Sequence, residues 1–161
     1  MSDKTAQGGD APLEFLKIER EADLPQWANR STLERFLHDE MTPYQDPPEA
    51  IALALDDCFH QAEGHGGFAM LCRAEGRLAG VCIMLRTGMR AYVPEWLLLM
   101  IGVESGLRGR GIGGKLARRC LAETGTGVKL HVEESNPARH LYERLGFRVR
   151  YAEMRYVPSD S

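Results

Sequence analysis

The stretch from Trp96 to Leu121 constrains this chain most, because it combines three different patterns in one short span. An unbroken apolar run from Trp96 to Val103 is typical of a strand buried on both faces. A glycine-rich segment follows, and then apolar residues at helical spacing. We therefore predict a strand, a loop and a helix, in which the glycines let backbone N–H groups approach a ligand at the helix start.

The charges in this stretch indicate that the ligand is an anion, most simply a phosphate. Between Ser105 and Ala122 every charged side chain is basic. These side chains are Arg108, Arg110, Lys115, Arg118 and Arg119. The whole chain has a formal net charge of -3, so the basic loop is a local feature and nucleic acid is not an expected partner.

The length of 161 residues predicts a single domain over residues 12–158, with tails at 1–11 and 159–161. The N-terminus lacks a basic region followed by an apolar one, and the longest apolar run is the length of a strand. We therefore expect neither a signal peptide nor a membrane span, and a cytoplasmic location. The four cysteines lack close C-x-x-C pairs, so we expect buried thiols and no metal site.

The rest of the chain predicts helices and strands in the order of a mixed α/β domain. The first predicted helix begins at Asp23 or Leu24, with Pro25 in its first turn, and the second begins at Pro48. The predicted strands lie at 13–19, 68–73, 77–86, 96–103, 128–132 and, as one long or two short strands, within 147–157. The last two helices run from the glycine loop to about Thr124 and from Asn136-Pro137 to Gly146.

Two common phosphate-binding motifs match the glycine loop but fail in context. Residues 109–114 satisfy G-x-G-x-x-G, yet five residues separate them from the strand, and too little chain remains for two mononucleotide-binding halves. Residues 109–115 satisfy the first seven positions of G-x-x-x-x-G-K-[ST]. The eighth position is Leu116, which cannot ligate Mg²⁺.

A third motif, [RQ]-x-x-G-x-[GA], is met by Arg108, Gly111 and Gly113. With this loop, and with HVEESNPARHLYERLGF as a second signature, the sequence resembles the GNAT superfamily of N-acetyltransferases. The resemblance covers roughly Phe68 to Val149. It implies a mixed α/β fold, with a mainly antiparallel central sheet of six to seven strands flanked by about four helices. It also implies direct transfer of an acetyl group from acetyl-CoA, without a metal, to a primary amine of a small molecule or protein.

The resemblance implies a cofactor site in two parts. Backbone amides and positive charge of the loop would hold the diphosphate of coenzyme A. The loop residues are Arg108, Gly109, Arg110, Gly111, Ile112, Gly113, Gly114 and Lys115. Backbone N–H groups of Ile101, Gly102 and Val103, where the central strand splays from the next one, would align and polarise the thioester.

The resemblance also places Tyr142 at the position of the general acid that protonates the leaving thiolate. Tyr142 equally fits the buried stripe of its own helix, and Asn136 fits either a helix N-cap or a cofactor contact. The position of the family's usual base carboxylate is occupied by Leu97, which cannot accept a proton. Glu95, two residues upstream, and His131 on the following strand are the candidate bases.

The acceptor is less constrained. Acidic residues in the first two helices either attract a cationic amine or form an ordinary solvated face. The segment after Gly146 is short, so the resemblance implies a short lid, or one supplied by a second subunit of a homodimer. Because Leu97 replaces the carboxylate, a weakly catalytic or non-catalytic acyl-CoA-binding module is the alternative function.

Overall fold

The computed structural model describes residues 12–159. The chain forms two compact units, one extending to His131 and one starting at Val132. The first unit contains the sheet and three α-helices, and the second contains one α-helix. The predicted N-terminal tail, residues 1–11, and residues 160–161 of the predicted C-terminal tail lie outside the described residues.

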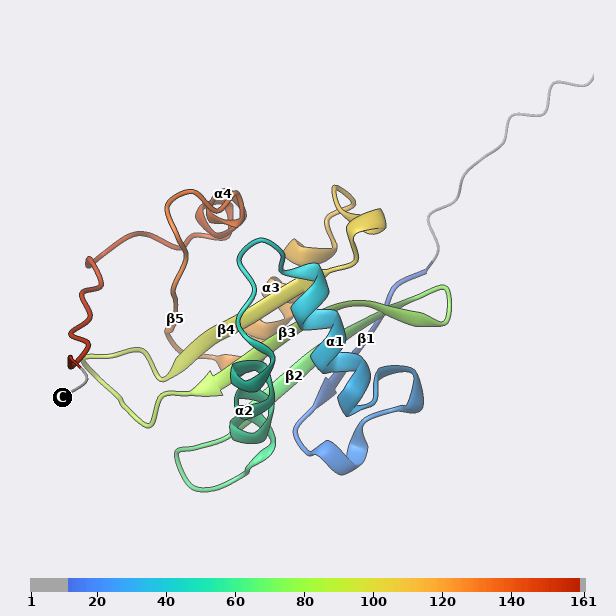
Figure 1. Cartoon of the computed structure of the whole chain (residues 1–161), viewed down its shortest axis with the longest axis horizontal. Coiled ribbons are helices and arrows are strands. Elements are labelled where there is room, and N and C mark those ends of the chain that lie inside the picture. Colours follow the sequence, from blue (N-terminus) through green and yellow to red (C-terminus); the bar gives the residue numbers. More distant parts are fainter. Residues whose placement is uncertain (1–11, 160–161) are drawn as a thin grey trace, which may run out of the picture. The chain divides into compact units, whose positions relative to one another are not determined.

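The sheet has five strands in the order β1-β2-β3-β4-β5 (Figure 1). The strands are β1 (Glu14–Ile18), β2 (Gly67–Ala74), β3 (Arg77–Arg86), β4 (Trp96–Val103) and β5 (Val128–Leu130). The pairings from β1 to β4 are antiparallel, and β4 and β5 are parallel. These pairings confirm the mixed α/β class and the mainly antiparallel sheet.

Five strands are fewer than the six to seven expected. The segment 147–157, predicted as one or two strands, forms no strand in the described part of the chain. The second unit by itself offers no strand for this segment to pair with, and an unpaired strand is not stable in water. The strand predicted at 128–132 is also shorter, because β5 ends at Leu130.

Helix α1 (Arg30–Glu40) begins later than predicted. Two short 3-10 turns occupy Glu21–Asp23, at the predicted helix start, and Gln26–Ala28, within the predicted first turns. The reason is the cap: Asn29 has extended backbone angles, and its side chain accepts a hydrogen bond from the Thr32 amide at 2.9 Å. The α-helix therefore starts after Asn29.

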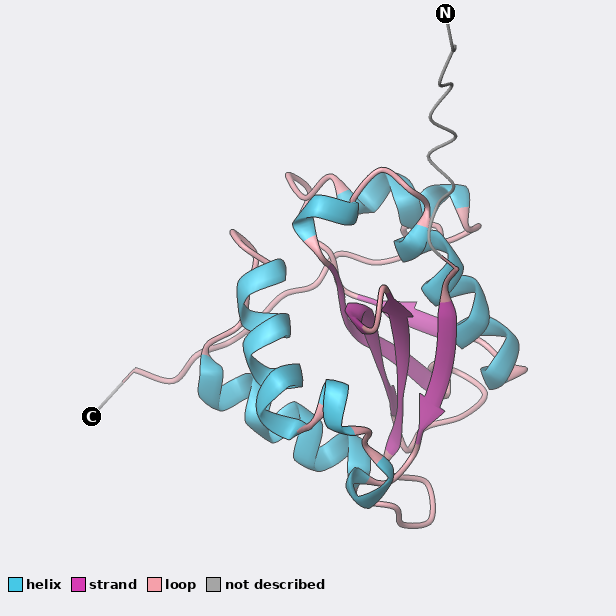
Figure 2. Cartoon of the chain, turned by 90° about the vertical axis from the view of Figure 1, so that its right-hand side faces the viewer, coloured by secondary structure: helices cyan, strands magenta, loops and turns pink. Residues whose placement is uncertain are grey.

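Helix α2 (Pro48–Phe59) begins at Pro48, as predicted. Its buried side chains and those of α1 pack together against one face of the sheet. The shared core includes Leu33 and Leu37 of α1, Ile51 and Leu55 of α2, and Val81 of β3. Figures 1 and 2 show these two helices on one side of the sheet.

Helix α3 (Ile112–Thr124) covers the opposite face of the sheet. It packs on β3 at Gly80, where a Cβ atom would lie 2.7 Å from the Leu116 Cδ1 atom and 3.2 Å from the Ile112 Cγ2 atom. A Cβ atom there would push the ends of the Leu116 and Ile112 side chains aside, so glycine lets α3 pack this closely on β3. The contact fixes the start of α3 against the sheet.

The second unit contains helix α4 (Ala138–Arg144). The predicted start at Asn136-Pro137 is close: the Asn136 Oδ1 atom accepts a hydrogen bond from the Ala138 amide at 2.9 Å. The helix ends two residues before Gly146, which has the positive φ of +102° expected at a helix C-terminus.

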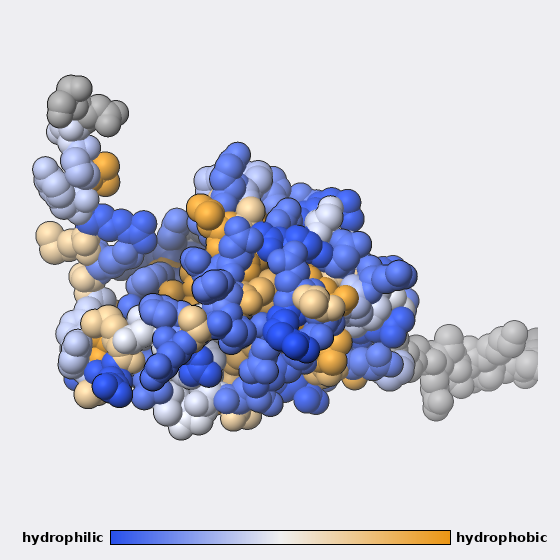
Figure 3. Space-filling model, turned by 90° about the horizontal axis from the view of Figure 1, so that it is seen from below, coloured by the Kyte–Doolittle hydropathy of each residue, from blue (hydrophilic) through white to orange (hydrophobic). Residues whose placement is uncertain are grey.

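The four cysteines are buried and free, as the sequence predicted. On the face seen in Figure 3, most residues are hydrophilic and the apolar ones form small groups. This distribution is expected when most large apolar side chains fill the core. In residues 12–159, no helix has both the length and the apolar character needed to cross a bilayer.

Candidate active site

Strand β4 contains an irregularity that turns its backbone amides around. Leu98 pairs with Met84 of β3, and Met100 pairs with Ile83, so Leu99 has no partner on β3. An extra residue of this kind is a β-bulge, which interrupts the ladder and reverses the alternation of the N–H groups beyond it.

The hydrogen bonds at the two ends of β4 agree with this reversal. The Trp96 amide donates toward β5, to the Gly127 carbonyl at 3.4 Å, whereas the Glu104 amide donates toward β3, to the Ala79 carbonyl at 2.9 Å. Without a bulge, two residues an even number apart would point to the same side. Beyond the bulge, the amides of Met100 and Gly102 therefore face β3, like that of Glu104.

The amides of Ile101 and Val103 consequently face the β5 side, where β4 pairs with no other strand of residues 12–159. The parallel ladder ends at the pair Leu98 and Leu130. This leaves a row of backbone donors past the end of β5, at the residues where the resemblance implied the splay. These N–H groups can donate hydrogen bonds to an extended ligand, as they would to an additional strand.

The loop after β4 connects this strand to the start of α3. A 3-10 turn (Ser105–Leu107) is followed by Gly109 and Gly111, both with positive φ near +80°. Gly111 is the N-cap of α3, and no side chain caps the helix. The first turn of α3 has no acidic residue, so its free amides and the positive end of the helix dipole favour an anion.

The predicted loop residues differ in their exposure. Arg108, Arg110 and Lys115 are exposed, Gly113 is half-buried, and Ile112 and Gly114 are buried against the sheet. The Arg108 guanidinium is already engaged: its Nε atom donates to the Val103 carbonyl at 3.3 Å, and its Nη2 atom donates to the Glu40 carbonyl. Arg108 therefore has protein partners without any ligand.

The predicted acid and the predicted cap belong to the second unit. Tyr142 lies on α4 with 7% of its surface exposed, and its ring meets that of Phe147 edge-on at 5.9 Å between centroids. The Asn136 side chain accepts a hydrogen bond from the Ala138 amide across Pro137, the N-cap residue of α4. The cofactor contact of Asn136 and the catalytic role of Tyr142 stay predictions.

The candidate bases lie at the margins of strands. Glu95 is exposed and directly precedes β4, and its carbonyl accepts a hydrogen bond from the Thr87 amide at 2.8 Å. His131 is exposed and follows the last residue of β5, so its predicted place within a strand is wrong. Leu97 is half-buried on β4.

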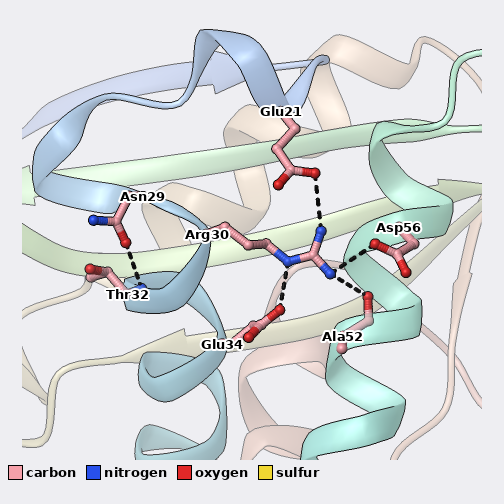
Figure 4. Close-up of polar contacts among 7 residues, drawn as sticks. All are labelled: Glu21, Asn29, Arg30, Thr32, Glu34, Ala52 and Asp56. Atoms are coloured by element: carbon pink, nitrogen blue, oxygen red, sulfur yellow. Dashed lines mark hydrogen bonds and ion pairs between the residues drawn. The ribbon is translucent and has the colours of Figure 1, made fainter.

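The acidic residues of the first two helices are partly neutralised by Arg30. Its guanidinium binds Glu21 at 3.1 Å, Glu34 at 2.6 Å and Asp56 at 2.9 Å, and the Ala52 carbonyl at 2.7 Å (Figure 4). Burial alone would lower the pKa of Arg30, but the hydrogen bonds to these carboxylates hold its pKa above the usual value. For Glu34 of α1 and Asp56 of α2, this network favours a structural role over attraction of a cationic acceptor.

Two features of the site were not predicted. The bulge at Leu99 has no sequence signal, because it lies within a uniform apolar run. Glu40 was grouped with the other acidic residues of α1, yet its carboxylate accepts a hydrogen bond from the Ser105 amide at 2.8 Å, at the start of the loop.

A family model for the acetyltransferase (GNAT) domain matches residues 65–149, more than half of the chain. The chain belongs to the GNAT acetyltransferase family. The matched range contains β4, the glycine loop, α3 and α4. Among curated proteins, none matches this sequence.

Solved structures of other acetyltransferases share the fold of this GNAT protein. One is described as a possible acetyltransferase from Clostridium difficile 630, with 14% identity and a TM-score of 0.67 over 92% of this chain and 99% of that one. The aminoglycoside N-acetyltransferase AAC(6')-Iy, solved in complex with CoA, has 18% identity and a TM-score of 0.64 over 94% and 97% of the two chains.

An aminoglycoside acetyltransferase from an uncultured soil metagenomic sample, solved in complex with sisomicin, is also similar. It has 17% identity and a TM-score of 0.62, over 91% of this chain and 97% of that one. Identities this low establish the fold of the GNAT protein and not its acceptor.

Proposed function

We propose that this GNAT protein transfers an acetyl group from acetyl-CoA to a primary amine of a small molecule or protein, by direct attack within a ternary complex. The observation that carries the proposal is the unpaired side of β4. The amides of Ile101 and Val103 face the β5 side beyond the last β4–β5 pair, and the glycine loop connects the strand to an uncapped helix start.

This arrangement suits a cosubstrate in which an extended arm is joined to a diphosphate. The β4 amides would bind the amide-bearing arm of coenzyme A like a neighbouring strand, and the free amides of α3 would bind the diphosphate. A β4 amide close to the thioester carbonyl would stabilise the oxyanion that forms as the amine attacks. Acetyl-CoA itself supplies the activated acyl group.

The proton transfers rest on the sequence resemblance. Tyr142 is the proposed acid: its phenol hydroxyl would donate a proton to the departing thiolate as the C–S bond breaks. Glu95 and His131, both exposed, are the proposed acceptors of the amine proton, directly or through water.

The experiment is an acceptor screen. Purified protein is given acetyl-CoA and a panel of polyamines, amino acids, aminoglycosides and lysine peptides, and the release of free thiol is followed. We expect at least one amine to raise thiol release well above background, with the acetylated product visible by mass spectrometry. Tight binding of acetyl-CoA without thiol release for any acceptor would contradict catalysis.

Tight binding of acetyl-CoA without thiol release is the result expected of an acyl-CoA-binding or sensing module. The observation that favours this alternative is Leu97, an apolar residue on β4 at the position of the family's usual base. The two functions are distinguished by turnover and not by binding, because both predict tight binding of acetyl-CoA.

A further inference from the structure

The last turn of α1 and the start of the cofactor loop hold each other by hydrogen bonds in both directions. Glu40, the final residue of α1, accepts a hydrogen bond from the Ser105 amide at its Oε2 atom, at 2.8 Å. In return, the Arg108 Nη2 atom donates to the main-chain carbonyl of Glu40 and lies 3.7 Å from its Oε2 atom. The two segments are 65 residues apart in the sequence, so this is a tertiary contact.

Arg108 extends the contact to β4. Its Nε atom donates to the Val103 carbonyl, so one guanidinium joins the end of α1 to the end of β4. The last carbonyls of a helix lack intrahelical partners and lie at the negative end of the helix dipole, where a cation stabilises them. Arg108 therefore caps α1 from outside the helix.

Side-chain packing beneath these hydrogen bonds fixes the contact between the end of α1 and β4. A Cβ atom on Gly102 of β4 would lie 3.5 Å from the Phe36 Cε1 atom, 3.8 Å from the Glu40 Cβ atom and 3.8 Å from the Met41 Cγ atom. The end of α1 thus packs on β4 at Gly102, between Ile101 and Val103, whose amides face the β5 side. The Glu40 side chain is only 19% exposed, which fits a structural contact better than a solvated charge.

We propose that Glu40 and Arg108 form a strap that holds the cofactor loop in place before coenzyme A binds. Arg108 is then a positioning residue for the loop amides, and the diphosphate is bound by those amides and not by the Arg108 side chain. This inference rests on the proposed function, because it concerns how the loop is held ready for coenzyme A.

The strap and a direct phosphate contact predict opposite effects of removing Glu40. A carboxylate beside an anion site repels the anion, and it also competes for the guanidinium of Arg108. If Arg108 binds the diphosphate directly, loss of the Glu40 carboxylate strengthens coenzyme A binding. If Glu40 holds the loop, its loss weakens binding despite the more favourable charge.

The test is the dissociation constant for CoA, measured by isothermal titration calorimetry on the full chain. For Glu40→Ala we expect about tenfold weaker binding, the effect of losing one well-ordered hydrogen bond. Glu40→Gln keeps an oxygen that accepts from the Ser105 amide, so its affinity should stay within about threefold of the original. Glu123→Ala is the control: it also removes one carboxylate and one ion pair, with Lys17 at 3.0 Å, but near the other end of α3.

A second pair of variants keeps the test decisive if Glu40→Ala folds poorly. Arg108→Gln retains an N–H donor without the charge, and Arg108→Ala retains neither. The strap predicts that only the alanine variant binds CoA about tenfold more weakly. In a turnover assay it should raise KM for acetyl-CoA and leave kcat unchanged at saturation.

Two results would overturn the strap: Glu40→Ala binding CoA as tightly as or more tightly than the original, or equal losses in Arg108→Gln and Arg108→Ala. Either result leaves the proposed function standing, because the original protein still binds CoA. Failure of the original protein to bind CoA would instead refute the proposed function, and the strap with it.

Discussion

The glycine that caps α3 offers a sharp test of the cofactor loop, because the same helix ends on a matched glycine. Gly111 at the N-terminus has φ +78°, and Gly125 at the C-terminus has φ +63°. A Cβ atom at either position would meet no heavy atom within 4 Å. Alanine therefore brings the same kind of backbone strain and no steric clash at both ends.

The cost in stability follows from the backbone alone. A non-glycine residue in the left-handed region costs about 1–2 kcal/mol, so each alanine variant should lower the free energy of unfolding by about 1 kcal/mol or slightly more. For a chain of this length, that corresponds to a fall in Tm of about 2–4 °C. Differential scanning fluorimetry should show similar falls for Gly111→Ala and Gly125→Ala.

The two variants should differ in coenzyme A binding. Relief of strain at Gly111 rotates the first peptide planes of α3, and each amide–phosphate hydrogen bond lost weakens binding about tenfold or more. Calorimetry should therefore show CoA binding at least tenfold weaker for Gly111→Ala and unchanged for Gly125→Ala. Equal affinities in the two variants would refute the assignment of the α3 N-terminus to the diphosphate.

Three further outcomes are expected. Tyr142→Phe should lower turnover, measured by thiol release, about 100-fold or more, and calorimetry should show a CoA affinity within about twofold of the original. Unchanged turnover would remove Tyr142 from the mechanism. Arg30→Met should lower Tm by about 4–8 °C, because it removes partly exposed ion pairs and one hydrogen bond to a carbonyl, together worth about 2 kcal/mol. The control Arg20→Met breaks only an exposed ion pair with Asp23 and should change Tm little. Burial raises the pKa of Cys58 to about 12, so Ellman's reagent should label this thiol only after denaturation. Above about pH 9 the thiol ionises only in the unfolded chain, so the free energy of unfolding should fall as the pH rises.

Local sequence signals were enough for several elements of the fold. The apolar run predicted β4 with the observed ends, Trp96 and Val103, although only alternate residues of the strand are buried and those between them are half-buried. Pro48 marked the start of α2 because its fixed φ suits a first helical turn. Gly111, read as part of a phosphate loop, lies at the start of α3.

Features that depend on distant partners were not predictable in this way. The bulge at Leu99 exists only in the pairing with β3, and the contact of Glu40 with Ser105 joins segments that no local pattern connects. The alternation in 147–157 indicated a strand, but a strand forms only where a neighbour is present. The start of α1 was misplaced because Pro25 and Asn29 are both good start signals, and the cap at Asn29 prevailed.

The central claim is that the outward amides of β4 receive the cosubstrate, and amide hydrogen exchange measured by NMR tests it most directly. In the free protein, the amides of Ile101 and Val103 should exchange faster than those of Met100 and Gly102, which face β3. Addition of CoA should slow exchange at Ile101 and Val103 and leave Met100 and Gly102 almost unchanged. Equal protection of all four amides in the free protein, or no response of Ile101 and Val103 to saturating CoA, would contradict the account.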